Sequence, residues 1–333
     1  MEQLEPVTPE TVSAALRSRA GLTLPPSELR LEQRHGRWIA RLPGNILALV
    51  ADNASAAARL AREAKLLRLL GSRVSFGLPS IQYDGPDLQV RTLVPGAQVG
   101  GEGRERDFAA RPQAMRLASD LGSALAQLHG ALTREEAEEF GSANIDTLPT
   151  ADALRARLEG KLPEPVTANA FDRLLDLHRA YEPREDDIVL AHGDLWGGNM
   201  AVDPDTGALK GLFDLDDAGL ADRHVDFMYF HSFSDAFARR ALASYAAEGD
   251  QFASWEQAAI YHAVAAFAAL ADIRGKGEHH LLQRRLDWVC DVCHGPIGTT
   301  LLGVRPSGNP PPPARGRPDR RHRSTASQRP RKT

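Results

Sequence analysis

The hydrophobic pattern of the chain changes its period about a third of the way along, and this change constrains the fold more than any other feature. Before residue 95, apolar and polar residues alternate over short runs that end in turn residues, which is typical of antiparallel strands. After residue 111 the apolar spacing becomes helical, most clearly over Met115–Leu132. The sequence therefore predicts an α+β fold with two lobes, and its 333 residues suffice for both.

The first lobe is expected over residues 1–95. A short helix is predicted at residues 10–20, and a second helix, capped by Asp52, Asn53 or Ser55, is predicted to end near Leu70. Three strands are expected before this second helix and two after it, namely Glu28–Gln33, Arg37–Leu42, Ile46–Val50, Pro79–Tyr83 and Asp87–Leu93. This order predicts a small antiparallel sheet carrying one helix.

The second lobe is expected over residues 111–303, after a linker at 96–110. The glycines of Gly96–Gly103 open no helix, so a linker is favoured over a phosphate-binding loop, and the chain has no P-loop motif. One β-rich interruption, Ile188–Asp217, is expected within this lobe. The further predicted helices are 151–160, 170–181, Asp235–Glu248, Ser254–Arg274 and His280–Cys293.

The β-rich interruption contains the polar pattern that carries chemistry. Residues 190–199 read LAHGDLWGGN, and Asp214 follows Asn199 by fifteen residues in the run GLFDLDDAGLADRHVD. Two strand-like stretches, IVLA and LKGLF, therefore each deliver an aspartate near their ends. Phosphoryl transfer needs one carboxylate for the acceptor hydroxyl and separate oxygen ligands for Mg²⁺. The spacing H-x-D-L-x-x-x-N matches the catalytic loop of protein kinases, with Gly193 in place of arginine.

These motifs resemble the aminoglycoside phosphotransferase/choline kinase superfamily, small-molecule kinases of the protein-kinase-like fold to which fructosamine and homoserine kinases are related. The resemblance is specific over residues 188–230, and the general layout agrees from about 10 to 300. It implies a small N-lobe with an antiparallel sheet and one helix, a large and mainly helical C-lobe, and ATP or GTP with Mg²⁺ as cofactors. A lone HGD or DxD is common in loops, but five polar residues at family spacing outweigh that alternative.

The resemblance also implies roles for individual residues. Asp194 would be the catalytic base, with His192 supporting the loop, while Asn199 and Asp214 would ligate magnesium. Trp196, Asp216 and Asp217 are candidate acceptor contacts, and both aspartates could equally be solvated turn residues. Asp222 and Asp226 match structural positions, Asp222 as a cap and Asp226 as a brace of the catalytic loop. Backbone groups near Thr92, Leu93 and Val94 would read the nucleotide base.

One departure from the family concerns the cation that holds the α- and β-phosphates. The family places a lysine or arginine on the third strand of the N-lobe, paired with a glutamate of the next helix. Glu63 fits that glutamate, but Ile46–Val50 contains no basic residue. Arg41 on the preceding strand is the expected substitute, and Lys65 is a neighbouring cation on another face of the helix.

Charge and cysteine content narrow the range of partners. Residues 304–333 contain nine Lys or Arg and one acid, a net charge of +8, which leaves −12 for residues 1–303. An acidic body favours a cationic ligand over nucleic acid, and the proline-rich tail is expected to be disordered. Cys290 and Cys293 are expected to be ordinary thiols. No secretion signal or membrane span is visible, so a cytoplasmic protein is expected, and nothing in the sequence indicates an oligomeric state.

The function expected from the sequence is O-phosphorylation of a small, cationic hydroxyl compound, such as an aminoglycoside, an amino alcohol or an amino sugar. The alternative is a pseudokinase that binds nucleotide and acts through a protein partner, and the missing strand cation motivates it. Protein kinase activity ranks third, because no A-P-E equivalent follows Asp214.

Overall fold

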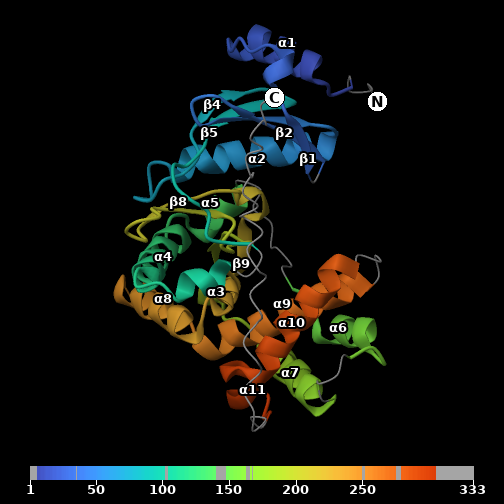
Figure 1. Cartoon of the computed structure of the whole chain (residues 1–333). Coiled ribbons are helices and arrows are strands. Elements are labelled where there is room, and N and C mark those ends of the chain that lie inside the picture. Colours follow the sequence, from blue (N-terminus) through green and yellow to red (C-terminus); the bar gives the residue numbers. More distant parts are fainter. Residues whose placement is uncertain are drawn as a thin grey trace, which may run out of the picture.

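The computed structural model describes residues 6–34, 36–101, 104–139, 148–162, 166, 168–249, 252–274 and 279–304. These residues form a small lobe above a larger helical lobe (Figure 1). The architecture confirms the α+β, protein-kinase-like fold that the sequence predicts.

The small lobe is built on a five-stranded antiparallel sheet in the order β1-β2-β3-β5-β4. Paired residues in neighbouring strands face the same side, and the register Arg37↔Ala51 and Leu47↔Arg91 fixes which side chains share a face with β3. The strands are β1 (Leu31–Arg34), β2 (Arg37–Leu42), β3 (Ile46–Ala51), β4 (Ile81–Asp84) and β5 (Leu88–Thr92).

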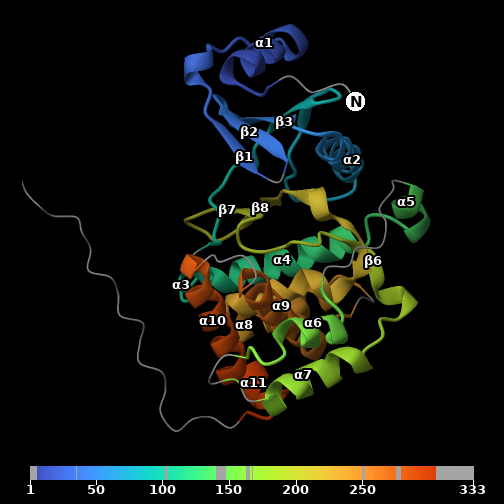
Figure 2. The ribbon, with the colours of Figure 1, turned by 90° about the vertical axis from the view of Figure 1, so that its right-hand side faces the viewer.

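Two helices cover the two faces of this sheet. Helix α1 (Pro9–Ala20) packs Val12 and Leu16 against apolar residues of β2, β3 and β5, whereas α2 (Ala54–Leu70) lies between the sheet and the larger lobe in Figure 1 and is seen end-on beside the sheet in Figure 2. The Asn53 side chain caps α2 by accepting a hydrogen bond from Ala56 N. Both helices were expected, but the sequence did not show that α1 closes the outer face of the sheet.

The larger lobe has one continuous apolar core, to which helices α4, α8 and α9 contribute many of the buried side chains. Its longer helices are α4 (Ala114–His129), α6 (Ala151–Leu158), α7 (Ala168–Ala180), α8 (Asp235–Ala247), α9 (Trp255–Arg274) and α10 (His279–His294). Three short helices were not predicted, namely α3 (Arg104–Ala109), α5 (Arg134–Glu139) and α11 (Pro296–Thr300). Each has six residues or fewer, which is too short for a period to be read.

Two antiparallel ribbons carry the polar motif at the top of the larger lobe. Strand β6 (Ile188–Ala191) pairs with β9 (Gly219–Asp222), and β7 (Met200–Val202) pairs with β8 (Leu209–Leu212). The 3₁₀ turn η3 (Leu215–Asp217) follows β8, and the longer 3₁₀ segment η4 (Arg223–Ser232) follows β9. The chain from Gly193 to Asn199 connects the two ribbons.

The glycine-rich segment expected to be a linker is anchored to this region in its described part. Ala97 forms an isolated bridge with Val202, and Gly100 N donates to Gly197 O at 2.7 Å. A Cβ on Gly100 would lie 2.2 Å from the Gly197 carbonyl carbon, so the two backbones are in direct contact. The link between the lobes therefore positions the polar loop as well as joining the sheet to the helices.

Other expectations concern the cysteines, the tail and the membrane. Cys290 and Cys293 are free thiols, and no group of three possible metal-binding His, Cys, Asp or Glu side chains occurs in the described part of the chain. The predicted tail falls almost wholly outside the described residues. None of the described helices is both long enough and apolar enough to cross a membrane.

Candidate active site

Asp194 and Asn199 face each other across the loop between β6 and β7. Asn199 Nδ2 donates to the backbone oxygen of Asp194 at 2.8 Å and to its Oδ2 at 3.1 Å. Burial and the nearby charges of Asp217 and Asp214 raise the pKa of Asp194 to about 6, although His192 and the Asn199 hydrogen bond oppose the shift. A carboxyl with this pKa is mostly ionised at neutral pH and still able to accept a proton.

Asp226 of η4 holds the start of the loop from below. Its carboxylate accepts hydrogen bonds from His192 N at 2.7 Å and Gly193 N at 2.9 Å, and it lies 3.0 Å from His129 Nε2. Burial would raise the pKa of Asp226, but the hydrogen bonds and charges of His129 and His192 hold it below its ordinary value. Gly193 has φ of 83°, a conformation that disfavours the arginine of the protein-kinase pattern.

Asp214 is presented by a strained backbone conformation. Its φ of 65° and ψ of 55° lie in the left-handed region, which non-glycine residues rarely adopt and which is enriched at functional sites. Two hydrogen bonds hold Phe213, the residue before Asp214. Phe213 N donates to Asn199 O, and His192 Nε2 lies 3.1 Å from Phe213 O. His192 therefore links the two segments that carry Asp194 and Asp214.

The donor set at this point is suited to magnesium. Both amide hydrogen bonds of Asn199 leave its Oδ1 for another partner, and the Asp214 side chain is 39 % exposed. Mg²⁺ prefers carboxylate and amide oxygens and keeps several of its waters, so two protein ligands are enough. Asn199 and Asp214 thus fit the metal that the sequence analysis assigns to them.

Two arginines, one from each of the strands that neighbour β3, bring positive charge close to Glu63. Its Oε1 lies 2.8 Å from Arg91 Nη1 of β5 and accepts a hydrogen bond from Leu215 N at 3.1 Å, and its Oε2 lies 4.0 Å from Arg37 Nη1 of β2. Arg41, the expected substitute, is exposed, and among the described residues no ion pair joins it to Glu63. Sequence reasoning missed Arg37 and Arg91, because the strand register places Arg41 on the same face and only the side-chain contacts show which arginines reach Glu63.

The two aspartates after Asp214 have different surroundings. Asp216 is buried and accepts hydrogen bonds from Arg59 Nη1 at 3.0 Å and Arg37 Nη1 at 3.4 Å, so its charge is directed toward the small lobe. Asp217 is exposed, and its charge acts on Asp194. The expectation of an acceptor contact therefore remains open for Asp217, whereas Asp216 is occupied by arginines.

The other expected residues lie around this centre. Trp196 is 36 % exposed, and its ring covers Gly198, where an added Cβ would lie only 2.2 Å from the ring. Asp222 caps η4 by accepting from His224 N, and it also accepts from Tyr261 Oη at 2.8 Å. The first residue is thus available to a ligand, and the second is structural.

The segment expected to bind the nucleotide base, Thr92 to Val94, already uses some of its backbone N–H groups in hydrogen bonds within the small lobe. Thr92 N donates to Ser80 O, and Leu93 N donates to Asn45 O at 2.7 Å. Across the described residues, no backbone hydrogen bond of this kind involves Val94 N. Of the three residues, Val94 is therefore the one with an N–H group left for a ligand.

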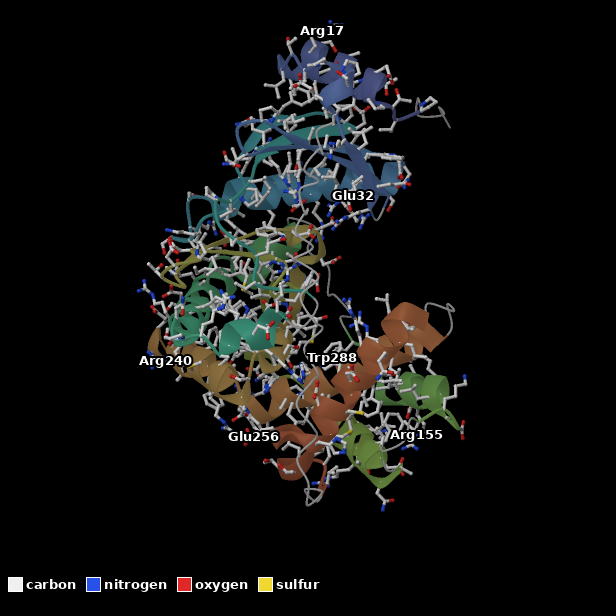
Figure 3. All side chains as sticks on the ribbon, viewed as in Figure 1. Arg17, Glu32, Arg155, Arg240, Glu256 and Trp288 are labelled. Carbon is white, nitrogen blue, oxygen red and sulfur yellow. The ribbon has the colours of Figure 1, made fainter. Side chains whose placement is uncertain are left out.

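Tyr229 of η4 and Trp288 of α10 form an aromatic pair that carries no signal in the sequence. The rings of Tyr229 and Trp288 are 6.3 Å apart, and the Arg285 guanidinium lies 5.6 Å from the Trp288 ring. Figure 3 shows Trp288 on the inner side of α10, turned toward the middle of the larger lobe. Burial and the charge of Asp194 raise the pKa of Tyr229 to about 12, with Arg285 opposing and Asp217 adding to the shift, so the Tyr229 hydroxyl lies within electrostatic range of Asp194.

Comparison with known proteins agrees with the fold and the motif. The model of the phosphotransferase enzyme family matches residues 26–265, well over half of the chain. An aminoglycoside 3'-phosphotransferase of Streptomyces fradiae is 30 % identical over 184 residues. That alignment covers 51 % of this chain and 66 % of the relative, just under two thirds of its length.

Solved structures show the same architecture at low identity. The GDP and kanamycin complex of APH(2'')-IIIa has a TM-score of 0.67 and 15 % identity, covering 85 % of this chain and 97 % of the other. Macrolide 2'-phosphotransferase MphH from Brachybacterium faecium has a TM-score of 0.61 and 21 % identity, covering 84 % and 97 %. At these identities the comparison establishes the fold.

Proposed function

Because this chain belongs to the phosphotransferase enzyme family, we propose that it transfers the γ-phosphoryl group of ATP or GTP to a hydroxyl group of a small cationic molecule. The observation that carries the proposal is the geometry of the loop, where the side-chain nitrogen of Asn199 holds Asp194 and the backbone oxygen of Asn199 accepts from Phe213 N, the residue before Asp214. We expect this nucleotide-dependent reaction to take place in the cytoplasm, where nucleoside triphosphates are abundant.

The residues of the loop have separate tasks in this reaction. Asp194 orients the acceptor hydroxyl and accepts its proton as the new oxygen–phosphorus bond forms and the bond from the γ-phosphorus to the departing nucleoside diphosphate breaks, and its raised pKa suits that transfer. His192 and Asp226 keep the loop in place through the hydrogen bonds described above. Asn199 and Asp214 would hold Mg²⁺, which when bound neutralises charge on the phosphates. Alignment and charge neutralisation supply most of the rate in such a site.

The acceptor is expected next to Asp194, between the exposed ring of Trp196 and the aromatic group of Tyr229 and Trp288. Asp217 adds a carboxylate at the same place, which favours a positively charged acceptor. Aminoglycosides, amino alcohols and amino sugars satisfy both requirements, because they combine hydroxyl groups with amines. The Streptomyces fradiae relative supports this class.

The pseudokinase alternative is less well supported. It depended on the absence of a cation near Glu63, and Arg91 and Arg37 supply positive charge there. Asp194, Asn199 and Asp214 also retain the side chains and the hydrogen-bonded arrangement that catalysis would need.

The experiment that tests the proposal is nucleotide turnover by the full chain with Mg²⁺ and ATP or GTP. A panel of aminoglycosides, amino alcohols, amino sugars and homoserine serves as acceptors, with Asp194→Ala in parallel. We expect turnover that depends on an acceptor and falls by about 10²–10⁴-fold in the variant, the range typical for a positioned general base. Nucleotide affinity should stay within a few-fold. Equal turnover by Asp194→Ala would refute the assignment, and nucleotide binding without turnover of any acceptor would favour the pseudokinase.

A further inference from the structure

Arg37 is surrounded by carboxylates at the boundary between the two lobes. It is the first residue of β2, and its side chain is only 8 % exposed. Its Nη2 donates to Asp214 Oδ1 at 2.8 Å, while its Nη1 lies 3.4 Å from Asp216 Oδ2 and 4.0 Å from Glu63 Oε2. One guanidinium thus connects the sheet of the small lobe to helix α2 and to the segment that carries the expected metal ligand.

The three carboxylates do not depend on Arg37 equally. Glu63 has Arg91 at 2.8 Å, and Asp216 has Arg59 at 3.0 Å. Among the described residues, Arg37 is the one cation that forms an ion pair with Asp214. Asp214 is also the most open of the three, with 39 % of its side chain exposed compared with 0 % for Glu63 and 7 % for Asp216.

Because of this asymmetry, the Arg37–Asp214 ion pair can open while the other two carboxylates stay paired. If Asp214 turns to another cation, Glu63 and Asp216 keep an arginine each, and no buried carboxylate is left uncompensated. Arg37 would then have free N–H groups at the opening of the site. A guanidinium is planar and can bind phosphate oxygens through two parallel hydrogen bonds. A ligand that brings a divalent cation and phosphates together satisfies both sides of the broken pair.

We propose that Arg37 binds the nucleotide phosphates in this chain, and that its ion pair with Asp214 is exchanged for them when the magnesium–nucleotide complex arrives. The proposal rests on the nucleotide-dependent function proposed above, because that function places phosphates beside Asp214. Arg91 has the separate task of neutralising Glu63. The phosphate-binding cation therefore lies on β2, immediately after the β1–β2 turn, and not on β3.

The first test measures nucleotide binding directly, without an acceptor. Titration calorimetry with the full chain gives dissociation constants for ATP, GTP and the matching nucleosides in Mg²⁺. Arg37→Ala is expected to weaken triphosphate binding by about ten-fold or more, as for a lost charged hydrogen bond, and to change nucleoside binding less than two-fold. Arg41→Ala, an exposed arginine on the same strand, is the matched control and should leave both unchanged.

The second test examines the exchange. In EDTA, Asp214→Asn removes the partner that holds Arg37 and should tighten binding of the metal-free triphosphate by about five-fold or more. In the Arg37→Ala background the same substitution only removes a repulsive charge, and the gain should be clearly smaller. Thermal unfolding shows whether each variant folds. If Arg37→Ala fails to fold, Arg37→Lys takes its place in the test. This variant keeps the positive charge but loses the planar guanidinium, so it should bind the triphosphate more weakly than the unmodified chain without losing binding altogether.

The outcomes separate this inference from the function on which it rests. If the unmodified chain binds a nucleotide and Arg37→Ala binds it equally well, the inference is overturned and the proposed function survives. An equal gain from Asp214→Asn in both backgrounds would overturn the exchange. Failure of the unmodified chain to bind ATP or GTP would overturn both.

Discussion

The ionised Asp194 side chain is expected to destabilise the folded protein, and the substitution Asp194→Asn measures this contribution to the free energy of unfolding. Burial raises the pKa of Asp194 from its usual 3.8 to about 6. Because one pKa unit corresponds to about 1.4 kcal/mol, a shift of about two units corresponds to an upper value of about 3 kcal/mol at neutral pH. Asparagine has the same shape, carries no charge and can still accept the Asn199 hydrogen bond. We expect Asp194→Asn to be more stable by about 1–3 kcal/mol in metal-free buffer.

The sign and the pH window follow from linkage. The folded state binds the Asp194 proton more tightly than the unfolded state, so this group contributes stability below about pH 4 that is lost as the pH rises through about 6. The advantage of Asp194→Asn should therefore be complete above pH 6. It should shrink by about 1.4 kcal/mol for each pH unit below that value.

The assay is thermal or denaturant unfolding in EDTA at several pH values between 5 and 8. The expected difference corresponds to a rise in Tm of about 2–6 °C for a protein of this size. Asp205→Asn, in the exposed turn between β7 and β8, is the matched control and should change stability by less than about 0.5 kcal/mol. A variant that is no more stable than the unmodified chain at pH 8, with a difference independent of pH, would refute the reasoning.

Three further predictions concern the supports of the site. Asp226→Asn should destabilise the protein by about 3 kcal/mol or more and lower kcat, because an amide NH2 would replace one of the two buried oxygens that face His129, His192 N and Gly193 N; circular dichroism and turnover can follow both effects. Gly100→Ala should lower Tm by several degrees, because its Cβ would lie 2.2 Å from Gly197, and an unchanged Tm would contradict that contact. Trp196→Ala should raise the KM for the acceptor several-fold while nucleotide affinity stays the same, and a parallel loss of both would argue against an acceptor contact.

The sequence predicts the features that depend on local pattern. Alternation places the strands of the small lobe within about three residues, and helical spacing identifies α4 and α9. The spacing of Asp194, Asn199 and Asp214 is also local, because Asp194 and Asp214 follow strands and Asn199 precedes one in the same stretch of chain. Such features are visible because neighbouring residues determine them.

The supports of the site depend on contacts between distant segments, and the sequence does not show them. His129 reaches Asp226 across 97 residues, at the end of a helix whose period indicates only an apolar face. Arg37 reaches Asp214 across 177 residues. A basic residue in a strand is ordinary until the register of the sheet shows what it faces.

The register also explains how strands other than β3 can supply the positive charge near Glu63. Leu47, Leu49 and Ala51 of β3 share one face of the sheet with the residues opposite them, so Arg91 beside Leu47 and Arg37 beside Ala51 flank an apolar row. The fold therefore constrains the charge near Glu63 and not the strand that supplies it.

Adding a cation to that row should be less harmful once Arg37 has been removed. Leu49 is buried and packs toward α2, so Leu49→Lys should destabilise the unmodified chain through lost packing and through repulsion by Arg37 and Arg91. In an Arg37→Ala background one repulsion is gone, and the lysine can approach the carboxylates that the arginine leaves. We expect a coupling of about 1 kcal/mol or more between the two substitutions, measured as a double-mutant cycle of unfolding free energies. Strictly additive effects would mean that residues 37 and 49 do not both interact with Glu63. The apolar row would then be a packing surface and not a place where a cation can pair with Glu63.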